Sequence, residues 1–284
     1  MGKIISVTNQ KGGVGKTTTA INLAACLALS GQKVLIIDID PQGNASSGLG
    51  VNLRENQKGI YELLAGDASL DQVIYPTEID TLKIIPSNVD LAGAEIELVG
   101  RDHREKILSM ALNGVNAEYE FIVIDCPPSL GLLTLNALTV SQSVLIPMQC
   151  EYYALQGLSH LLKTLQRIKK SINPNLKVEG ILLTMYDNRT LLTSQVENQV
   201  KKYFSEFLMK TIIPRNIRLS EAPSHGKPIV LYANRSKGSD SYVELAQEVI
   251  QRTKGEMVSP KTEPQEITYE EWIKENQLRD FLKK

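Results

Sequence analysis

The fold of this chain is decided by one glycine-rich stretch, Asn9-Gln10-Lys11-Gly12-Gly13-Val14-Gly15-Lys16-Thr17-Thr18-Thr19. An apolar run at residues 3–8 (KIISVT) precedes it and predicts a buried strand, and an Ala- and Leu-rich run at residues 20–30 predicts a helix after it. In that setting the backbone N–H groups of the loop and the positive end of the helix dipole can bind an anion. The stretch therefore predicts a phosphate-binding loop, with Lys16 in reach of the β- and γ-phosphates and the Thr17 hydroxyl on Mg²⁺.

The loop departs from the common pattern G-x-x-x-x-G-K-[ST] at two positions. Gln10 stands where that pattern has a glycine, and Lys11 adds a lysine directly before the glycine pair. The form K-G-G-V-G-K-T-T resembles the deviant Walker A motif of the ParA/MinD/nitrogenase-iron-protein class of ATPases. A P-loop that acts within one subunit does not need Lys11. The resemblance implies that Lys11 reaches the nucleotide of a second subunit, as an arginine finger does.

Composition limits which other functions the chain can have. Thirty-one basic residues stand against 32 acidic ones, a net charge of −1, so contact with nucleic acid would need a local basic patch. No stretch approaches the ~18 apolar residues that cross a bilayer, and residues 1–7 lack a signal-peptide pattern. Cys26, Cys126 and Cys150 have no metal-ligand spacing and are expected to be reduced thiols of a cytoplasmic protein.

Apolar runs and helical patterns alternate along the chain. Further strands are expected at residues 33–38, 81–86, 120–125, 143–147, 178–184 and 209–213. Further helices are expected at residues 60–65, 92–113 with an interruption near Gly100, 130–140, 154–172, 193–207 and 239–253. This alternation predicts an α/β fold with a doubly wound, mostly parallel sheet that has helices on both faces. We assign residues 1–254 to one P-loop ATPase domain.

The remaining residues change in character. Residues 255–267 are polar with two prolines and predict a linker. Residues 268–284 predict a C-terminal amphipathic helical tail with one apolar stripe, made of Tyr269, Trp272, Ile273, Leu278, Phe281 and Leu282. Four acidic and four basic residues balance each other in this tail. We expect the tail to dock on its own domain or on a partner.

Acidic residues follow two of the predicted strands. Asp125 comes after four apolar residues and matches a Walker B aspartate, which holds Mg²⁺ directly or through water beside the Thr17 hydroxyl. Asp38 and Asp40 point the same way in an extended segment, so one could anchor the P-loop while the other meets the γ-phosphate. Because the carboxyl ends of parallel strands meet at one edge, the loop, Asp40, Asp125 and Pro214 are expected on one rim.

Four further blocks look like the Soj-type chromosomal ParA proteins: DIDPQGN at 38–44, DCPPSLG at 125–131, QCEYYAL at 149–155 and IPRNIRLSEAPSHGKP at 213–228. The resemblance covers roughly residues 1–252. It implies that Asp40 positions the attacking water while Asp38 is structural, and that the adenine lies against Pro214 and Asn216. It also implies that the phosphates contact Lys11, Gly12, Gly13, Val14, Gly15, Lys16, Thr17 and Thr18.

The function implied by this resemblance is a weak, Mg²⁺-dependent ATP hydrolase that a ParB-type centromere-binding partner stimulates. Two subunits would sandwich two ATP molecules in a homodimer, with Lys11, Lys16 and Asp40 as the catalytic residues. The dimer would bind nonspecific double-stranded DNA and drive partitioning of a chromosome or a plasmid, in the cytoplasm and on the nucleoid. The residues leave open whether a replication initiator is a further partner.

Arg189 and Arg218 occupy the positions that match DNA-binding arginines of this family. Independently of that resemblance, residues 186–235 carry eight bases against four acids. A local excess of this kind is a plausible phosphate footprint, and two subunits would double it. An ordinary solvated face is the alternative interpretation.

A MinD-like membrane-positioning ATPase, anchored reversibly by residues 268–284, is the rival hypothesis. Trp272, Ile273 and Phe281 suit an interfacial helix, but the balanced charge of the tail suits anionic lipid poorly. A membrane partner is therefore not expected. Cys126 and Cys150 do not resemble the cluster ligands of the nitrogenase iron protein, so no iron–sulfur role is expected.

Overall fold

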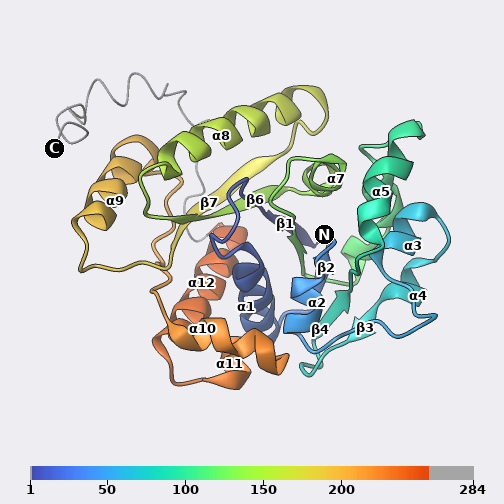
Figure 1. Ribbon diagram of the computed structural model, residues 1–284, viewed down its shortest axis with the longest axis horizontal. Coiled ribbons are helices and arrows are strands. Elements are labelled where there is room, and N and C mark those ends of the chain that lie inside the picture. Colours follow the sequence, from blue (N-terminus) through green and yellow to red (C-terminus); the bar gives the residue numbers. More distant parts are fainter. Residues whose placement is uncertain (1, 256–284) are drawn as a thin grey trace.

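A mostly parallel sheet runs through the structure, a computed structural model that describes residues 2–255 (Figure 1). Its strand order is β3-β4-β2-β5-β1-β6-β7. Neighbouring strands pair in parallel except β3 and β4, which are antiparallel. The strands are β1 (Lys3–Val7), β2 (Val34–Asp38), β3 (Tyr75–Pro76), β4 (Leu82–Ile85), β5 (Phe121–Asp125), β6 (Ser143–Gln149) and β7 (Lys177–Thr184). The expected fold class is confirmed.

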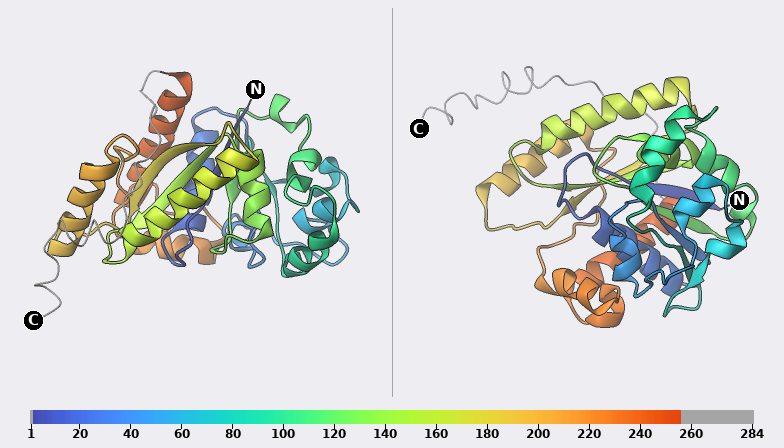
Figure 2. Two further views of the ribbon diagram at one scale, coloured as in Figure 1. Left: turned by 90° about the horizontal axis from the view of Figure 1, so that it is seen from above. Right: turned by 45° about the vertical axis from the view of Figure 1, so that its right-hand side comes forward.

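Helices cover both faces of this sheet (Figure 2). One layer contains α1 (Lys16–Leu29), α2 (Asn44–Gly48), α10 (Ile217–Glu221), α11 (Ile229–Tyr232) and α12 (Lys237–Lys254). The other contains α3 (Ile60–Ala65), α4 (Leu70–Val73), α5 (Leu91–Glu97), α6 (Ile107–Ala111), α7 (Leu132–Val140), α8 (Ala154–Ser171) and α9 (Leu191–Phe204). Short 3₁₀ turns lie at Leu98–Gly100, Val115–Ala117 and Ala222–His225.

The central strands are buried on both sides, which explains why they have no alternation of polar and apolar residues. Ile36 of β2 packs into the layer of α1 and α12, whereas Ile37 packs into the layer of α3 and α5. Successive side chains of a strand point to opposite faces, so both must be apolar when helices cover both faces. Within residues 2–255, no helix is both long enough and apolar enough to cross a membrane.

One expected helix is wrong in detail, and one strand was not predicted. The helix expected at 92–113 is divided into α5, a 3₁₀ turn and α6, because the intervening Arg101-Asp102-His103-Arg104-Glu105 has no apolar residue to cover the core. His103 there adopts a φ of +53°, which no helix allows. The short antiparallel strand β3 had no counterpart among the predicted strands. Helix α12 ends at Lys254, and the predicted tail lies outside the described residues.

The strand expected at 209–213 is also wrong. The two ends of this segment are hydrogen-bonded to β7: Met209 N–H donates to Ile181 O (2.9 Å), and Ile213 N–H donates to Leu183 O (2.9 Å). Between these points the N–H groups of Lys210 and Thr211 donate instead to the carboxylate of Glu248 on α12, both at 3.0 Å. Because these two N–H groups are hydrogen-bonded to the Glu248 side chain, the segment does not form a regular strand of the sheet.

Glu248 is itself held in a buried ion pair with Arg252 (2.8 Å), whose guanidinium also donates to the carbonyl oxygen of Glu179 (2.9 Å). Burial alone would raise the pKa of Glu248, but the bonds from Lys210, Thr211 and Arg252 outweigh burial and hold it below its ordinary value of 4.5. The charge on Glu248 therefore stabilises the junction of α12 with the edge of the sheet.

We expect Glu248→Ala to lower the free energy of unfolding by about 3–5 kcal/mol, because it leaves Arg252 buried without its partner. Urea unfolding measures this, with exposed Glu244→Ala on the same helix as the control. Because the folded pKa is lowered, this contribution is present above pH 4.5 and is lost as the pH falls through the folded pKa. A wild type and a Glu248→Ala variant that lose stability in parallel below pH 4.5 would contradict the assignment.

Candidate nucleotide site

Three central strands end at one level and bring the predicted loop and carboxylates together. In the sheet register Val7 of β1 and Asp38 of β2 both lie beside Asp125 of β5. The glycine loop follows β1 directly, and Asp40 follows β2 by two residues. The expected common rim is thus formed by the carboxyl ends of adjacent strands.

The glycine loop leaves open space in front of α1. Gly13 and Gly15 adopt φ values of +75° and +85°, a conformation that only glycine adopts readily. A Cβ built on Gly12 or Gly13 would meet no atom within 4 Å. Gly15 is the N-cap of α1, and no side chain of the described chain caps the helix there. The first N–H groups of α1 are therefore available to an anion.

The ends of β6 and β7 fix the loop on its other side. Asn9 donates through Nδ2 to Pro147 O (2.8 Å), and its Oδ1 accepts from Lys11 N–H (3.0 Å). The Thr184 hydroxyl donates to Val14 O (2.8 Å), and Val14 is almost fully buried. The loop is thus held in its shape by the protein itself.

The two lysines of the loop have different surroundings. Lys16 is buried, and its Nζ donates to Lys11 O (3.2 Å). Burial lowers the pKa of Lys16, although Asp125 and Asp40 act in the opposite direction. The Lys11 side chain is 41% exposed and pairs with Glu151 of the same chain, at the end of β6. Lys11 thus points to the surface, where a second molecule can reach it.

Asp125 is the most unusual group of the site. It is fully buried, and neither carboxylate oxygen has a hydrogen-bond partner among the described residues. Burial and the nearby Asp38 carboxylate raise its pKa well above the ordinary value, while Thr17 and Lys16 act the other way. The Thr17 hydroxyl is close enough to affect this pKa, yet it does not meet hydrogen-bond geometry. A buried carboxylate that lies beside a hydroxyl, and whose two oxygens accept no hydrogen bond from the described residues, fits a hard divalent cation.

Asp38 and Asp40 are fixed differently. Asp38 Oδ2 accepts from the N–H (2.8 Å) and the hydroxyl (2.7 Å) of Ser46, and its Oδ1 accepts from Asp40 N–H (3.2 Å). Burial raises the pKa of Asp38 to about 6, against the lowering effect of these bonds. Asp40 uses one oxygen for Gln42 N–H (3.0 Å). Asp38 therefore holds the segment that carries Asp40.

Pro214 and Asn216 lie in the segment that precedes α10, next to the end of β7. Pro214 forms an isolated bridge with Tyr186, which follows β7, and Arg215 N–H donates to Tyr186 O (3.0 Å). Asn216 is the N-cap of α10, and its side-chain oxygen accepts from Arg218 N–H (2.9 Å). Its amide nitrogen remains as the group that could meet a base.

Known proteins share this arrangement. A family profile described as an AAA domain matches residues 2–178. The sporulation initiation inhibitor protein Soj of Bacillus subtilis (strain 168) is 58% identical over 249 residues, which cover 88% of this chain and 98% of that protein. This chain belongs to the ParA/Soj family of chromosome-partitioning ATPases. The chromosome partitioning protein ParA of Myxococcus xanthus (strain DK1622), another member of the ParA/Soj family, is 54% identical over 252 residues. This alignment covers 89% of this chain and 89% of that protein.

Solved structures agree with the fold of this ParA/Soj family member. The crystal structure of cobyrinic acid a,c-diamide synthase from Mycobacterium smegmatis, with bound ADP and magnesium, aligns with a TM-score of 0.80 at 35% identity. The alignment covers 92% of this chain and 98% of that one. The similarity therefore extends over nearly the whole α/β domain and is not limited to the glycine loop.

The two arginines that the sequence predicts as DNA contacts are exposed, but each has a carboxylate partner. Arg189 Nη2 contacts Asp187 at 2.6 Å, and Arg218 Nη1 contacts Glu221 at 2.8 Å. Two further bases of residues 186–235 are also paired, in Lys201–Glu197 and Lys227–Glu78. At least four of the eight bases of residues 186–235 are therefore paired with carboxylates.

Ser46 and Glu151 contribute to the site but were not predicted. Both lie in or near the family blocks, yet no spacing rule shows that Ser46 holds Asp38 or that Glu151 pairs with Lys11. The Ser46 hydroxyl donates to Asp38 and also accepts from Ser87 N–H (2.9 Å), so it links β2 to the segment after β4. Such a link depends on the three-dimensional arrangement of the strands.

We expect Ser46→Ala to lower the free energy of unfolding by about 1–3 kcal/mol, because Ser87 N–H loses its acceptor inside the protein. Chemical denaturation measures the difference. Ser47→Ala is the matched control, since Ser47 is exposed one residue away. Equal effects of the two substitutions would show that the Ser46 hydroxyl does not hold this segment.

Proposed function

We propose that this chain is an ATP-dependent switch that dimerises when it binds ATP and Mg²⁺, binds DNA as a dimer, and partitions a chromosome or plasmid with a ParB-type partner. The observation that carries the proposal is the buried Asp125, whose carboxylate lacks a partner within the described residues beside the open glycine loop. That carboxylate is unfavourable unless a cation meets it. Membership in the ParA/Soj family supports the same conclusion.

In the proposed complex the phosphates lie in the glycine loop. N–H groups of residues 12–18 donate to phosphate oxygens, and Lys16 neutralises the β- and γ-phosphates from its buried position. Thr17 and Asp125 would hold Mg²⁺, which neutralises charge that develops on the phosphate oxygens. Pro214 and Asn216 would contact the adenine, with the amide nitrogen of Asn216 as the polar contact.

Asp40 is proposed to orient the attacking water. Its backbone N–H is fixed by Asp38, and one of its oxygens is engaged with Gln42 N–H within its own loop. A carboxylate that is held by its own loop is a poor water acceptor until that loop rearranges. This supports slow hydrolysis by the chain alone and stimulation by a partner.

Lys11 is proposed to contact the γ-phosphate of the second subunit. Its present partner, Glu151, is about half exposed, and exposed pairs of this kind contribute only about 0–1 kcal/mol. Exchange of Glu151 for a multiply charged phosphate is therefore favourable. Because Lys11 and ATP lie on different subunits, ATP binding and homodimer formation become one event, and hydrolysis separates the subunits.

The dimer is proposed to bind nonspecific double-stranded DNA through Arg189 and Arg218. Both form exposed ion pairs within the chain, so phosphates can replace Asp187 and Glu221 at small cost. Counterion release favours that exchange, and two copies of each arginine make affinity depend on dimerisation. A protein of this kind would occupy the nucleoid, and the ParB-type partner would release it there by triggering hydrolysis.

With ATP and Mg²⁺, wild-type protein is expected to sediment as a dimer, and with ADP or no nucleotide as a monomer. Lys16→Ala should remain monomeric in all three conditions, because the phosphates lose their buried counter-charge. Asp40→Ala should accumulate as the ATP dimer, because hydrolysis no longer separates it. Sedimentation velocity measures all three proteins.

Exposed Lys83→Ala and Asp71→Ala serve as the matched controls and should behave as wild type. A dimer that forms equally in every nucleotide state would overturn the proposed switch. ATP-dependent dimerisation of Lys16→Ala would overturn the assignment of that lysine.

For DNA binding, we expect Arg218→Glu to weaken the ATP-dependent affinity for a random-sequence duplex and to reduce the slope of log K against log salt by about 1 per lost phosphate contact. Fluorescence anisotropy at several salt concentrations measures both quantities. Lys177→Glu reverses an exposed charge at the amino end of β7 and should have no such effect. Equal losses for the two variants would indicate a general charge effect and no defined DNA contact.

A further inference from the structure

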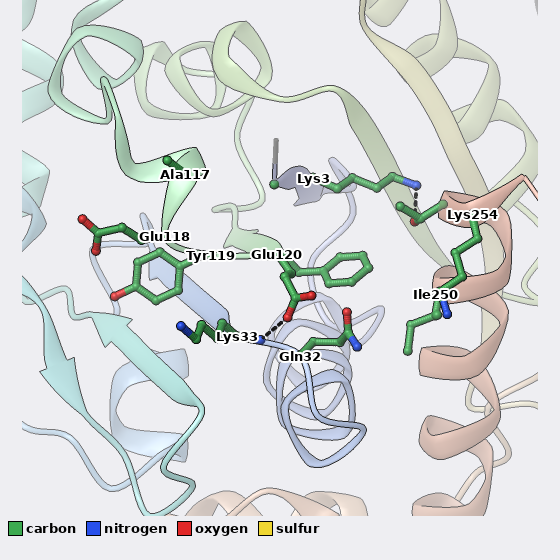
Figure 3. A pocket seen from close by; sticks show the side chains of 12 residues that line it. Lys3, Gln32, Lys33, Ala117, Glu118, Tyr119, Glu120, Ile250 and Lys254 are labelled. Carbon is green, nitrogen blue, oxygen red and sulfur yellow. Dashed lines mark hydrogen bonds between the residues drawn. The ribbon is translucent and has the colours of Figure 1, made fainter.

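A hollow lies at the edge of the sheet opposite the nucleotide rim (Figure 3). It is formed where β1 and β5 begin, and it is bounded by the segment before β2 and the last turns of α12. Its volume is about 530 Å³. Sites of ~300–1,000 Å³ hold small ligands or a few side chains, so one or two aromatic rings fit here.

The walls of the hollow combine an apolar base with a charged rim. Tyr119, Phe121 and Ile250 supply apolar surface. Two lysines of the rim, Lys33 and Lys254, form no ion pair with any described residue. Two glutamates, Glu118 and Glu120, also line the hollow. The hollow therefore suits a segment that carries aromatic side chains and charges of both signs.

The described part of the chain ends beside this hollow. Thr253 and Lys254 belong both to the lining and to the last turn of α12. Gly255 follows with a φ of +74°, a left-handed cap that turns the chain away from the helix axis. When fully extended, residues 256–267 span up to about 40 Å, so residues 268–284 can reach back into the hollow.

The chemistry of residues 268–284 matches the hollow. Residues 268–275 (TYEEWIKE) contain Tyr269, Trp272 and Ile273 together with three acids and one base. The aromatic side chains of this segment suit the apolar base of the hollow. Its three acids can face Lys33 and Lys254, and its base, Lys274, can face Glu118 or Glu120. The linker also keeps the segment at high effective concentration, which lets a modest contact form within one molecule.

We propose that residues 268–284 dock in this hollow, with Trp272 against Tyr119 and Ile250 and with Glu270 or Glu271 near Lys33 and Lys254. The contact covers the end of α12, whose Tyr242 hydroxyl meets the Thr19 hydroxyl of α1 (3.2 Å). Docking thereby adds a second attachment to the helix that packs against the nucleotide-binding α1. The proposal does not depend on ATP or DNA.

The experiment uses the only tryptophan of the chain, Trp272, so its emission reports this segment alone. In the full chain without nucleotide, docking predicts a blue-shifted emission and a several-fold lower acrylamide quenching constant than in a free peptide of residues 268–284. Ala117→Arg places a bulky charge in the hollow from an exposed position and should restore the emission and quenching of the free peptide. Ala92→Arg, exposed on α5, is the matched control.

A second pair of variants keeps the test valid if Ala117→Arg fails to fold. The double variant Lys33→Glu/Lys254→Glu should expose Trp272, whereas exposed Lys83→Glu should not. Emission of the wild type equal to that of the free peptide would overturn the proposal, as would shielding that none of the hollow variants changes. Shielding that disappears on dilution would identify a second copy as the docking surface, and shielding that appears only with anionic vesicles would identify a membrane. Either result also overturns the proposal.

Discussion

The site depends on charges that are buried at the ends of three adjacent strands. Asp38 and Asp125 lie side by side in the register of β2 and β5, and Lys16 is buried beside them. Burial raises the pKa of both carboxyls, and repulsion from Asp38 adds to that effect at Asp125. Asp38 satisfies its oxygens with Ser46 and Asp40, but Asp125 has no such partners among the described residues. Local instability of this kind is typical of a site that is completed by its ligand.

The surrounding fold keeps this cluster in place. Helices pack on both faces of these strands, so a shift in register between β2 and β5 would disrupt apolar packing in both layers. Helix α1 packs on the sheet beside α12, and its N-terminus faces the same point as the strand ends. The positive end of α1, the Lys16 ammonium and two carboxylates are thus brought together by ordinary core packing.

Residue patterns predicted most of this arrangement, because its main elements are local. The apolar runs that became β1, β2 and β5 are contiguous, and the glycine loop is a continuous motif. The strand at 209–213 could not be predicted correctly, because its conformation depends on Glu248, which is distant in the sequence. The roles of Ser46 and Glu151 depend on similar contacts between distant segments. Periodicity shows which face of an element is apolar, but it cannot show which distant side chain accepts its N–H groups.

The ion pairs of the structure separate into two classes that match their proposed roles. Glu248 and Arg252 are buried with further hydrogen bonds, so neither charge can leave without a cost of several kcal/mol. Lys11, Arg189 and Arg218, the three bases proposed to contact another molecule, are all exposed and held by single carboxylates. Exposed pairs of this kind contribute little to stability, so a polyphosphate or a DNA backbone can replace the carboxylate. The buried pair thus stabilises the monomer, whereas the three bases proposed to contact another molecule lie in surface pairs that exchange easily.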